Sequence, residues 1–341
     1  MARIALDAMG GDFAPDAPIA GALDAILELE PPHSIQLIGR GDVVHRTLES
    51  LLAGTHAAAS APRARLEIID APDVIEMSDK PSSAVRAKPN SSMLIGLRMQ
   101  TEGTSDAFVS AGNTGAQMAA STMLLKLHAG LKRPAIATLF PSARKPVVVL
   151  DSGANVDCSA HELSQFARLG AVYAEDLLGR SNPAVGLLSI GEEAEKGNQV
   201  VKEANALLRS AGLHFIGNVE GRDLPLGACD HGPIDVVVCD GFVGNVLLKF
   251  YESVGPMLLE IVARHADVGK PGLAAALRAL DYSEYGGAPL LGVRGVSIIC
   301  HGKSSARAIK NALGVALRAH ESRMNDHIGR RLALVEGEHV A

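Results

Sequence analysis

The chain contains few aromatic side chains and no long apolar run. Its 341 residues include no Trp, and aromatic residues make up only 3% although 47% of the chain is hydrophobic. The core must therefore be built from Ala, Val, Leu and Ile, which suits buried parallel strands and the helices that cover them. The longest uncharged stretch, 107–125, is interrupted by Ser, Gly, Asn, Thr and Gln. It predicts a strand, a loop and a helix start rather than a membrane span.

Cysteine is scarce, and its spacing argues against metal and disulfide frameworks. The four cysteines are Cys158, Cys229, Cys239 and Cys300. No two of them form a CxxC pair, so the sequence predicts neither a zinc site nor a disulfide framework and is typical of a reducing cytosol. No secretory signal precedes the first predicted strand, 2–7. We therefore expect a cytoplasmic protein.

Positive charge is in deficit. The chain has 32 Lys and Arg against 38 Asp and Glu, which gives a formal net charge of −6. This balance argues against general nucleic-acid binding, which needs a basic surface. A local basic patch remains compatible with it.

Both common nucleotide-binding fingerprints are missing. The dinucleotide motif GxGxxG would need a glycine where the loop 110–117 has Ser110. The phosphate-loop motif GxxxxGK[ST] would need a glycine where the chain has Ser297. The sequence therefore supports neither a nicotinamide nor an ATP site, and we expect no cofactor.

Six short apolar stretches each end in a glycine-rich loop that leads into a helix-like stretch. The loops are 7–15, 110–117, 151–155, 189–198, 240–245 and 301–306. This alternation predicts an α/β fold with three layers, in which helices cover both faces of a mostly parallel sheet. The loops should share the carboxyl edge of the strands, where such folds bind ligands. We expect one domain over 1–330, with two lobes around a cleft, and a loosely ordered tail over 331–341.

Local patterns give further expectations about the chain. Strands over 135–139 and 146–150 lie close together in the sequence, which favours an antiparallel pair. The polar segment 76–93 predicts a loop whose Ser91 and Ser92 cap a helix over 92–101. The stretch 224–235 is predicted to be a surface loop.

The loop SAGNTGAQ at 110–117 is the strongest candidate for binding an anion. Gly112 and Gly115 would let the backbone approach a ligand, and Asn113 and Thr114 could donate side-chain hydrogen bonds. Together with Ser110, these residues precede a predicted helix, whose start adds positive partial charge. The alternative is an ordinary strand-to-helix turn.

Two further residues are candidates for chemistry. Lys196 lies between a strand end and a helix, with Gly191 and Gly197 on either side. It belongs either to a functional loop or to a solvated run of charges. Asn245 follows Gly244 at the start of an apolar helix. The pattern alone favours a helix N-cap, and the alternative is an amide that donates to an oxyanion.

The remaining polar and glycine residues of these loops are further candidates for the site. They are Asp7, Gly10, Gly11, Asp12, Asp151, Asn155, Asp240, His301 and Lys303. Such carboxylates could bind a metal, but they more commonly cap helices or orient basic groups, and we expect no metal. A histidine placed like His301 is more often structural than catalytic.

The segment 254–280 predicts amphipathic helices over about 243–265 and 272–280. One face carries Met257, Leu258, Ile261 and Val262, and another carries Leu273, Leu277 and Leu280. The pattern favours core packing or a dimer interface. The alternative is contact with a membrane surface or an acyl chain.

Taken together, these loops resemble the phosphate acyltransferase family, PlsX, of bacterial phospholipid synthesis. The matching stretches are IALDAMGGDFAP at 4–15, DKPSSAVRAK at 79–88, VSAGNTGA at 109–116, LDSGAN at 150–155, GEEAEKGN at 191–198, FIGNVEGRDL at 215–224, DGFVGNVLLK at 240–249, YGGAPLLGVRG at 285–295 and HGKSSARAIKNAL at 301–313. Each is weak alone, but nine in this order are highly specific.

The resemblance implies that acyl–acyl carrier protein and inorganic phosphate are converted to acyl phosphate and free carrier protein. It implies a fold like isocitrate dehydrogenase and phosphotransacetylase, a homodimer, and peripheral association with the inner membrane face. The acyl phosphate would pass to a membrane acyltransferase that acylates glycerol 3-phosphate. The family's essential Lys and Asn map onto Lys196 and Asn245, which overrides the cap interpretation of Asn245.

An acidic carrier protein would need a local basic docking patch. Candidates are Arg294, Lys303, Arg307 and Lys310, or Arg264, Lys270 and Arg278. Three other functions stay open: a phosphotransacetylase acting on short acyl–coenzyme A, a dehydrogenase of the isocitrate type, and a non-catalytic adaptor for membrane lipid enzymes.

Overall fold

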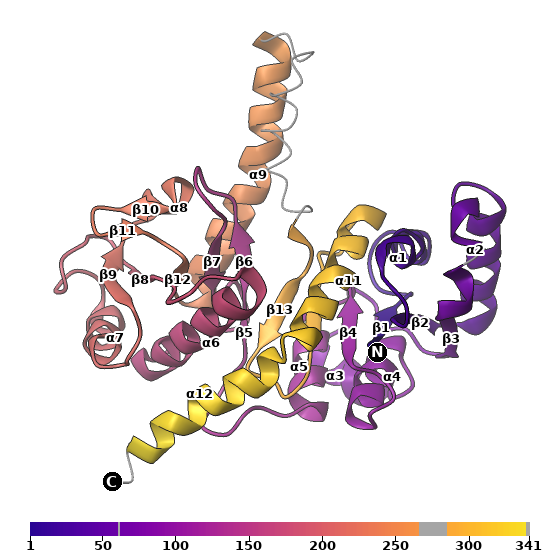
Figure 1. Cartoon of the computed structure of the whole chain (residues 1–341), viewed down its shortest axis with the longest axis horizontal. Coiled ribbons are helices and arrows are strands. Elements are labelled where there is room, and N and C mark those ends of the chain that lie inside the picture. The colour runs from indigo at the N-terminus through magenta and orange to yellow at the C-terminus, as the bar shows by residue number, and fades with distance from the viewer. Residues whose placement is uncertain (61, 266–284, 339–341) are drawn as a thin grey trace. The chain divides into compact units, whose positions relative to one another are not determined.

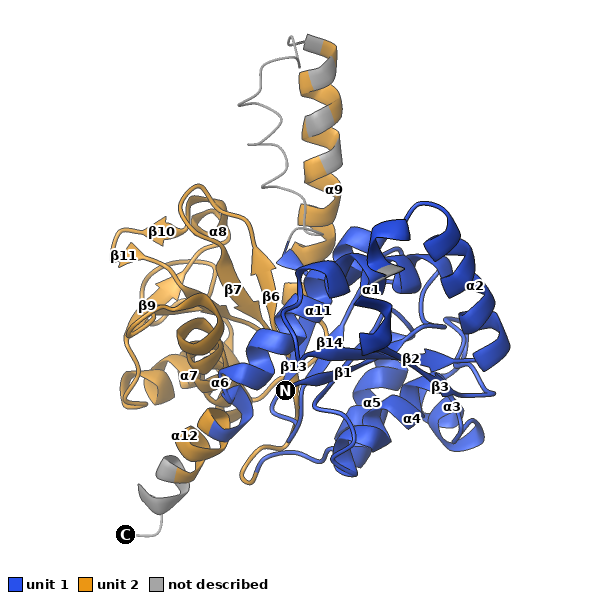
Figure 2. Ribbon diagram, turned by 45° about the vertical axis from the view of Figure 1, so that its right-hand side comes forward, with its two compact units in different colours: residues 1–128, 285–326 blue, residues 129–284, 327–341 orange. Residues whose placement is uncertain are grey.

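The chain divides into two compact units in the computed structural model (Figure 2). The structure describes residues 1–60, 62–265 and 285–338. Unit 1 is formed by Met1–His128 and Tyr285–Asp326, and unit 2 by Ala129–Glu284 and His327–Ala341. The helix expected over 272–280 lies outside the described residues.

Unit 1 is built on a mostly parallel sheet. Its strands, in order across the sheet, are β3 (Leu66–Asp70), β2 (Ser34–Gly39), β1 (Arg3–Asp7), β4 (Ala107–Ser110), β14 (Ser297–Ile299) and β13 (Ala288–Leu291). The first five run parallel, and β13 is antiparallel to β14. The loops that follow β1, β4 and β14 therefore leave the sheet at one edge, as the sequence predicts.

Helices cover both faces of this sheet. They are α1 (Asp16–Glu28), α2 (Gly41–Ala53), α3 (Pro81–Ala87), α4 (Ser92–Thr101), α5 (Thr114–Leu124) and α11 (Ala306–Glu321), with short 3₁₀ turns at Ala57–Ser60 and Pro62–Arg65. Figures 1 and 2 both place α1 and α11 on one face and α3, α4 and α5 on the other. The three-layer prediction is thus confirmed. The cap on α4 is also confirmed, because Ser91 Oγ accepts the Leu94 N–H at 3.4 Å. Helix α3 was not predicted.

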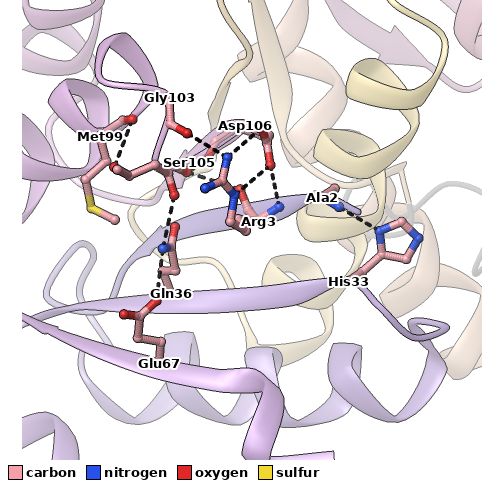
Figure 3. Close-up of polar contacts among 11 residues, drawn as sticks. Ala2, Arg3, His33, Gln36, Glu67, Met99, Gly103, Ser105 and Asp106 are labelled. Atoms are coloured by element: carbon pink, nitrogen blue, oxygen red, sulfur yellow. Dashed lines mark hydrogen bonds and ion pairs between the residues drawn. The ribbon is translucent and has the colours of Figure 1, made fainter.

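Polar side chains fix the opposite, amino-terminal edge of the same sheet (Figure 3). The Arg3 backbone N–H donates to Asp106 Oδ2 at 2.7 Å, and its guanidinium donates to the same carboxylate and to the Gly103 carbonyl. Gln36 Nε2 donates to Glu67 Oε2 at 3.0 Å. Side chains lock this edge, whereas glycine-rich loops form the carboxyl edge.

Unit 2 is built on a second sheet. Its strands, in order, are β6 (Thr138–Phe140), β7 (Val147–Leu150), β12 (Val236–Val238), β8 (Val185–Leu188) and β9 (Phe215–Val219). The last four run parallel. Strand β6 is antiparallel to β7, which confirms the pair expected from the sequence. Every side chain of β7 and β12 is buried, as continuous valine runs predict for parallel strands covered on both faces.

The other elements of unit 2 include a short helix and a two-stranded hairpin that the sequence did not predict. The helices are α6 (Ala160–Leu178), α7 (Gln199–Arg209), α8 (Asp223–Leu226), α9 (Gly241–His265) and α12 (Met324–Glu338), whose first residues belong to unit 1; short strands are β5 (Ala135–Ile136), β10 (Ala228–Cys229) and β11 (Gly232–Pro233). The expectation of a simple surface loop over 224–235 is wrong, because this segment forms part of α8 and a hairpin and buries Leu224 and Ile234.

The described part of the tail expected over 331–341 is helical, because α12 continues to Glu338. Arg331 Nη2 donates to Glu175 Oε2 at 2.7 Å, and Leu332 is buried. The sequence pattern misses these contacts because their partners lie far away along the chain.

Helix α9 is amphipathic, as the periodicity predicts, but Met257, Leu258 and Ile261, for which the pattern favoured core packing or a dimer interface, are exposed. Val243, Leu247 and Tyr251 pack against the core of unit 2. Among the side chains of α9 that the structure describes, the large apolar ones that are exposed are Phe242, Val246, Phe250, Met257, Leu258 and Ile261; we call these six residues the α9 stripe. The stripe therefore lies outside the buried core. Among the described residues, no helix is long and apolar enough to cross a membrane.

Candidate active site

In unit 1, the loops after β1 and β4 meet through a buried carboxyl–hydroxyl pair. Ser110 Oγ donates to Asp7 Oδ2 at 2.7 Å and accepts the Gly112 N–H at 2.9 Å. The Met9 N–H donates to the other Asp7 oxygen at 3.1 Å. Burial raises the pKa of Asp7, although hydrogen bonds from Ser92 and Ser110 oppose this effect. Asp7 and Ser110 are therefore buried residues that fix the backbone of these two loops.

Glycine at two of these positions is required by the packing of the loops on each other. A Cβ on Gly10 would lie 2.7 Å from Asp7 Oδ2 and 2.8 Å from the Gly112 nitrogen. A Cβ on Gly115 would lie 2.7 Å from Pro81 Cγ. The sequence predicted that Gly115 would let the backbone approach a ligand, whereas in the structure this glycine lies against Pro81.

Asn113 has a different role from the one that the sequence suggested. Its Oδ1 accepts the Ala116 N–H at 3.0 Å and so caps α5, and its Nδ2 donates to the Met77 and Asp79 carbonyls at 3.1 and 3.0 Å. An asparagine directly before a helix is a common N-cap, and this rule could have identified it. The exposed Thr114 and the first N–H groups of α5 are the groups that this turn offers to an anion.

The third loop of unit 1 is joined to the first by the backbone. The Asp12 N–H donates to the Gly302 carbonyl at 2.7 Å. The Lys303 N–H donates to His301 Nδ1 at 3.1 Å, so this ring nitrogen is an acceptor. The side chains of Asp12 and Lys303 are exposed. The predicted unit 1 residues thus gather at one edge, with Lys303 as an exposed cation.

In unit 2, Asp151 organises the loop that follows β7. Its carboxylate accepts N–H groups from the backbone of Ile136, Ala154 and Asn155, at 3.0, 3.0 and 2.6 Å, and from Asn155 Nδ2 at 2.9 Å. Asp151 is fully buried, which raises its pKa, while these hydrogen bonds act in the opposite direction. Both oxygens of the Asp151 carboxylate already accept hydrogen bonds from the protein, so Asp151 organises the loop and is not placed as a metal ligand. Within the described ranges, no group of three or more His, Cys, Asp or Glu could hold a metal ion.

Asp240, not Asn245, caps helix α9. Asp240 Oδ1 accepts the Val243 N–H at 2.8 Å. Because α9 begins at Gly241, Asn245 lies in its second turn, where its side chain is exposed. A Cβ on Gly153 would lie 3.4 Å from Asn245 Cβ, so Asn245 stands beside the 151–155 loop. The cap that the local pattern favoured is therefore wrong, and the amide of Asn245 is available to a ligand.

The first turn of α9 lies directly against the Asp151 loop, and this contact predicts a sharp difference between two glycines. A Cβ on Gly244 would lie 1.9 Å from the Asp151 carbonyl oxygen, whereas one on Gly314 of α11 would lie 3.5 Å from Arg318 Nη1. We expect Gly244→Ala to destabilise the protein by about 2–3 kcal/mol, because backbone must move to admit the methyl group.

The matched control is Gly314→Ala. It should stabilise the protein by about 0.5–1 kcal/mol, since alanine favours a helix interior. Thermal unfolding followed by circular dichroism measures both variants. Equal shifts of the two midpoints would contradict the packing described for Gly244.

Lys196 lies on a tightly built loop after β8. Its backbone N–H donates to the Glu193 carbonyl at 3.0 Å, which closes a turn. A Cβ on Gly191 would lie 2.9 Å from Lys196 Cγ, so the missing side chain makes room for the lysine stem. Gly197 has a φ of 97°, and Asn198 caps α7 by accepting the Val201 N–H at 2.9 Å. Lys196 itself is exposed.

The carboxyl edge of unit 2 brings three predicted loops together. Strand β12 pairs in parallel with both β7 and β8, so the loops 151–155, 240–245 and 189–198 leave neighbouring strands at one edge. An exposed lysine and an exposed amide on such an edge can neutralise an anion and donate to a developing oxyanion. Sequence reasoning missed Asn218, a buried residue whose only signal was the stretch 215–224.

Comparisons with known proteins agree with this architecture. The family model described as "Fatty acid synthesis protein" matches residues 2–327. The phosphate acyltransferase of Heliobacterium modesticaldum is 49% identical over 324 residues, covering 92% of each chain, and that of Desulforamulus reducens is 48% identical over 325 residues, covering 93% of each.

Solved structures share the fold at low sequence identity. A phosphotransacetylase from Streptococcus pyogenes has a TM-score of 0.64 at 17% identity, and the EutD phosphotransacetylase from Staphylococcus aureus has 0.60 at 13%; each comparison covers 94% of both chains. The fold is therefore the phosphotransacetylase-like α/β fold that the resemblance implied. On the family model and these relatives, the chain belongs to the phosphate acyltransferase family and is an acyltransferase of fatty acid and lipid synthesis.

Proposed function

We propose that this protein transfers an acyl group from acyl–acyl carrier protein to inorganic phosphate, releasing acyl phosphate and the free carrier-protein thiol. The observation that carries the proposal is the placement of Lys196 and Asn245. Both are exposed: Lys196 lies on the loop that follows β8, and Asn245 lies in the second turn of α9, which follows the adjacent parallel strand β12. The names of relatives that are 49% and 48% identical over nearly the whole chain support phosphate as the acceptor.

The reaction demands little acid–base chemistry from the protein. Phosphate has a second pKa close to the value of about 6 found in phosphoesters, so its dianion can attack a thioester without a strong base. The leaving thiol has a pKa of about 8.5, so the thiolate can depart with little acid assistance. Positioning is therefore the main task, and it can lower the barrier by roughly 7–11 kcal/mol.

Each candidate residue then has a distinct role. In unit 1, the Thr114 hydroxyl and the first N–H groups of α5 are the candidates for binding phosphate, on a loop whose shape Ser110, Gly112 and Asn113 fix. In unit 2, Lys196 is the candidate for neutralising the charge of a reacting phosphate. Asn245 donates to the thioester oxygen, and one such donor is worth about 3–4 kcal/mol.

The carrier protein and the membrane would approach other surfaces. Lys303 and Arg294 are exposed and are the stronger docking candidates for an acidic carrier protein. Lys310 is paired with Glu28 at 2.8 Å and Arg264 with Glu260, while Lys270 and Arg278 lie outside the described residues. The α9 stripe offers apolar surface to a second copy in a homodimer or to a membrane. Peripheral membrane contact would pass acyl phosphate to the acyltransferase that acylates glycerol 3-phosphate.

The test is the release of thiol from palmitoyl–acyl carrier protein by the purified full chain, with and without inorganic phosphate. We expect release only when phosphate is present, with palmitoyl phosphate as the product. Phosphate-independent release would indicate a thioesterase, and a preference for acetyl–coenzyme A would indicate a phosphotransacetylase. Absence of release from either substrate would contradict the proposal and favour an adaptor.

A further inference from the structure

The Lys196 loop is joined to α7 by a chain of hydrogen bonds through two buried asparagine side chains. Asn218 Nδ2 donates to the Glu193 carbonyl at 2.7 Å. Asn218 Oδ1 accepts from Asn205 Nδ2 at 2.8 Å, and Asn205 Oδ1 accepts from Arg209 Nε at 2.9 Å. Asn218 is 0% exposed and Asn205 is 2% exposed. The three side chains form one chain of hydrogen bonds from α7 through β9 to the loop.

This chain of hydrogen bonds ends at the Glu193 carbonyl, which also bonds to the backbone of Lys196. The Glu193 oxygen accepts both the Asn218 amide and the backbone N–H of Lys196. Two donors on one oxygen fix the turn in place. The stem of Lys196 also lies over Gly191, where a Cβ would be 2.9 Å from Lys196 Cγ.

The orientation of the Asn218 amide is set by its partners. Its nitrogen must face the Glu193 carbonyl, because its oxygen is occupied by the Asn205 amide. An ionised aspartate of the same shape would place an oxygen acceptor against the carbonyl oxygen and remove the donor group of this side chain, which leaves the Lys196 N–H as the remaining donor to that carbonyl. The site therefore distinguishes Asn from Asp by chemistry rather than by volume.

We propose that Asn218 is a positioning residue that acts through Lys196: by clamping the Glu193 carbonyl, it holds the lysine ammonium where the reacting anion binds. This inference rests on the proposed function. A misplacement of about 1 Å can cost about 10²-fold in rate. Asn218→Asp should therefore lower the turnover of the acyl transfer by about 10²-fold, with a much smaller effect on the KM for carrier-bound substrate.

A double-mutant cycle tests the route of the effect. Thiol release is measured for the wild type, Asn218→Asp, Lys196→Ala and the double variant. In the Lys196→Ala background, Asn218→Asp should change the rate by less than about twofold, because residues that act as one unit are not additive. An equal loss in both backgrounds would overturn the proposal. If Lys196→Ala alone keeps full activity, the lysine is dispensable and the Asn218 proposal is overturned, whereas the proposed function stands. The proposed function fails if the wild type itself releases no thiol in response to phosphate.

A second measurement does not depend on activity. Hydrogen exchange of the peptide that covers 191–198 should be at least about tenfold faster in Asn218→Asp and in Asn218→Ala than in the wild type, because the clamped turn opens more often. Unchanged exchange would overturn the clamp whatever the kinetics show. Gln36→Ala is the matched control: it removes a buried amide of unit 1 that also donates to a carbonyl, that of Thr104. It should leave both turnover and exchange at 191–198 unchanged.

Discussion

Replacing Lys196 with Ala should lower phosphate-dependent thiol release by about 10³-fold, the scale of a lost charge-stabilising group in a transition state. The lysine is exposed, and its stem packs over Gly191 at the carboxyl edge of unit 2. The substitution removes the charge that faces the reacting phosphate and leaves the turn that carries it intact. Stability should change by no more than about 0.5 kcal/mol, as is usual for surface side chains. Initial rates across a range of phosphate concentrations and thermal unfolding measure the two effects.

Lys202→Ala is the control for this result. Lys202 is also an exposed lysine, and it lies in the first turn of α7, the helix that directly follows the loop. Its loss should leave the rate unchanged. Wild-type activity in Lys196→Ala, or an equal loss in Lys202→Ala, would show that the lysine contributes only general surface charge.

Replacing Asn245 with Ala should lower turnover by about 10²–10³-fold, the cost of removing one oxyanion donor. The same change should not lower stability. Asn245 is exposed in the second turn of α9, where alanine favours the helix more than asparagine does. The contrast between a large kinetic effect and an unchanged thermal midpoint separates a chemical role from a structural one.

Asp240→Ala is the comparison variant for stability, because it should lower the thermal midpoint, which Asn245→Ala should leave unchanged. It removes the side chain that accepts the Val243 N–H at 2.8 Å, and losing such a cap costs about 1 kcal/mol. If Asn245→Ala lowered the midpoint as much as Asp240→Ala while keeping its turnover, the amide would be structural and its proposed role would be wrong.

The features that the sequence predicted well are those that short-range patterns determine. Valine-rich runs predicted the buried strands β7 and β12, and the glycine loops predicted which sheet edge carries the candidate residues. Ser91 was recognised as a cap because the rule for N-caps is local. The positions of Lys196 and Asn245 after adjacent strands of one sheet follow from the same alternation of strands and helices.

The features that it missed depend on partners distant in the chain. Asn113 looked like a ligand donor, but its Nδ2 is occupied by the carbonyls of Met77 and Asp79. Apart from the stretch 215–224, Asn218 showed no signal in the sequence, because its importance lies in a contact with Glu193, in the loop that follows the neighbouring strand β8. The local pattern predicts a loose tail from residue 331 because the polar residues of α12 find their partners on α6, for example Arg331 with Glu175. Local propensity does not predict contacts between residues that are distant in the sequence.

The division of unit 1 into two chain segments has a consequence for synthesis. Strand β14 lies between β4 and β13, yet it belongs to the second segment. While the ribosome makes Ala129–Glu284, the nascent unit 1 carries β4 with an unpaired edge, which is a known hazard for aggregation. Unit 2 in turn lacks most of α12 until the last residues emerge. Neither unit can complete its fold before nearly the whole chain has been synthesised. A prematurely terminated chain therefore contains no completely folded unit, and its unpaired sheet edges are exposed to chaperones and proteases.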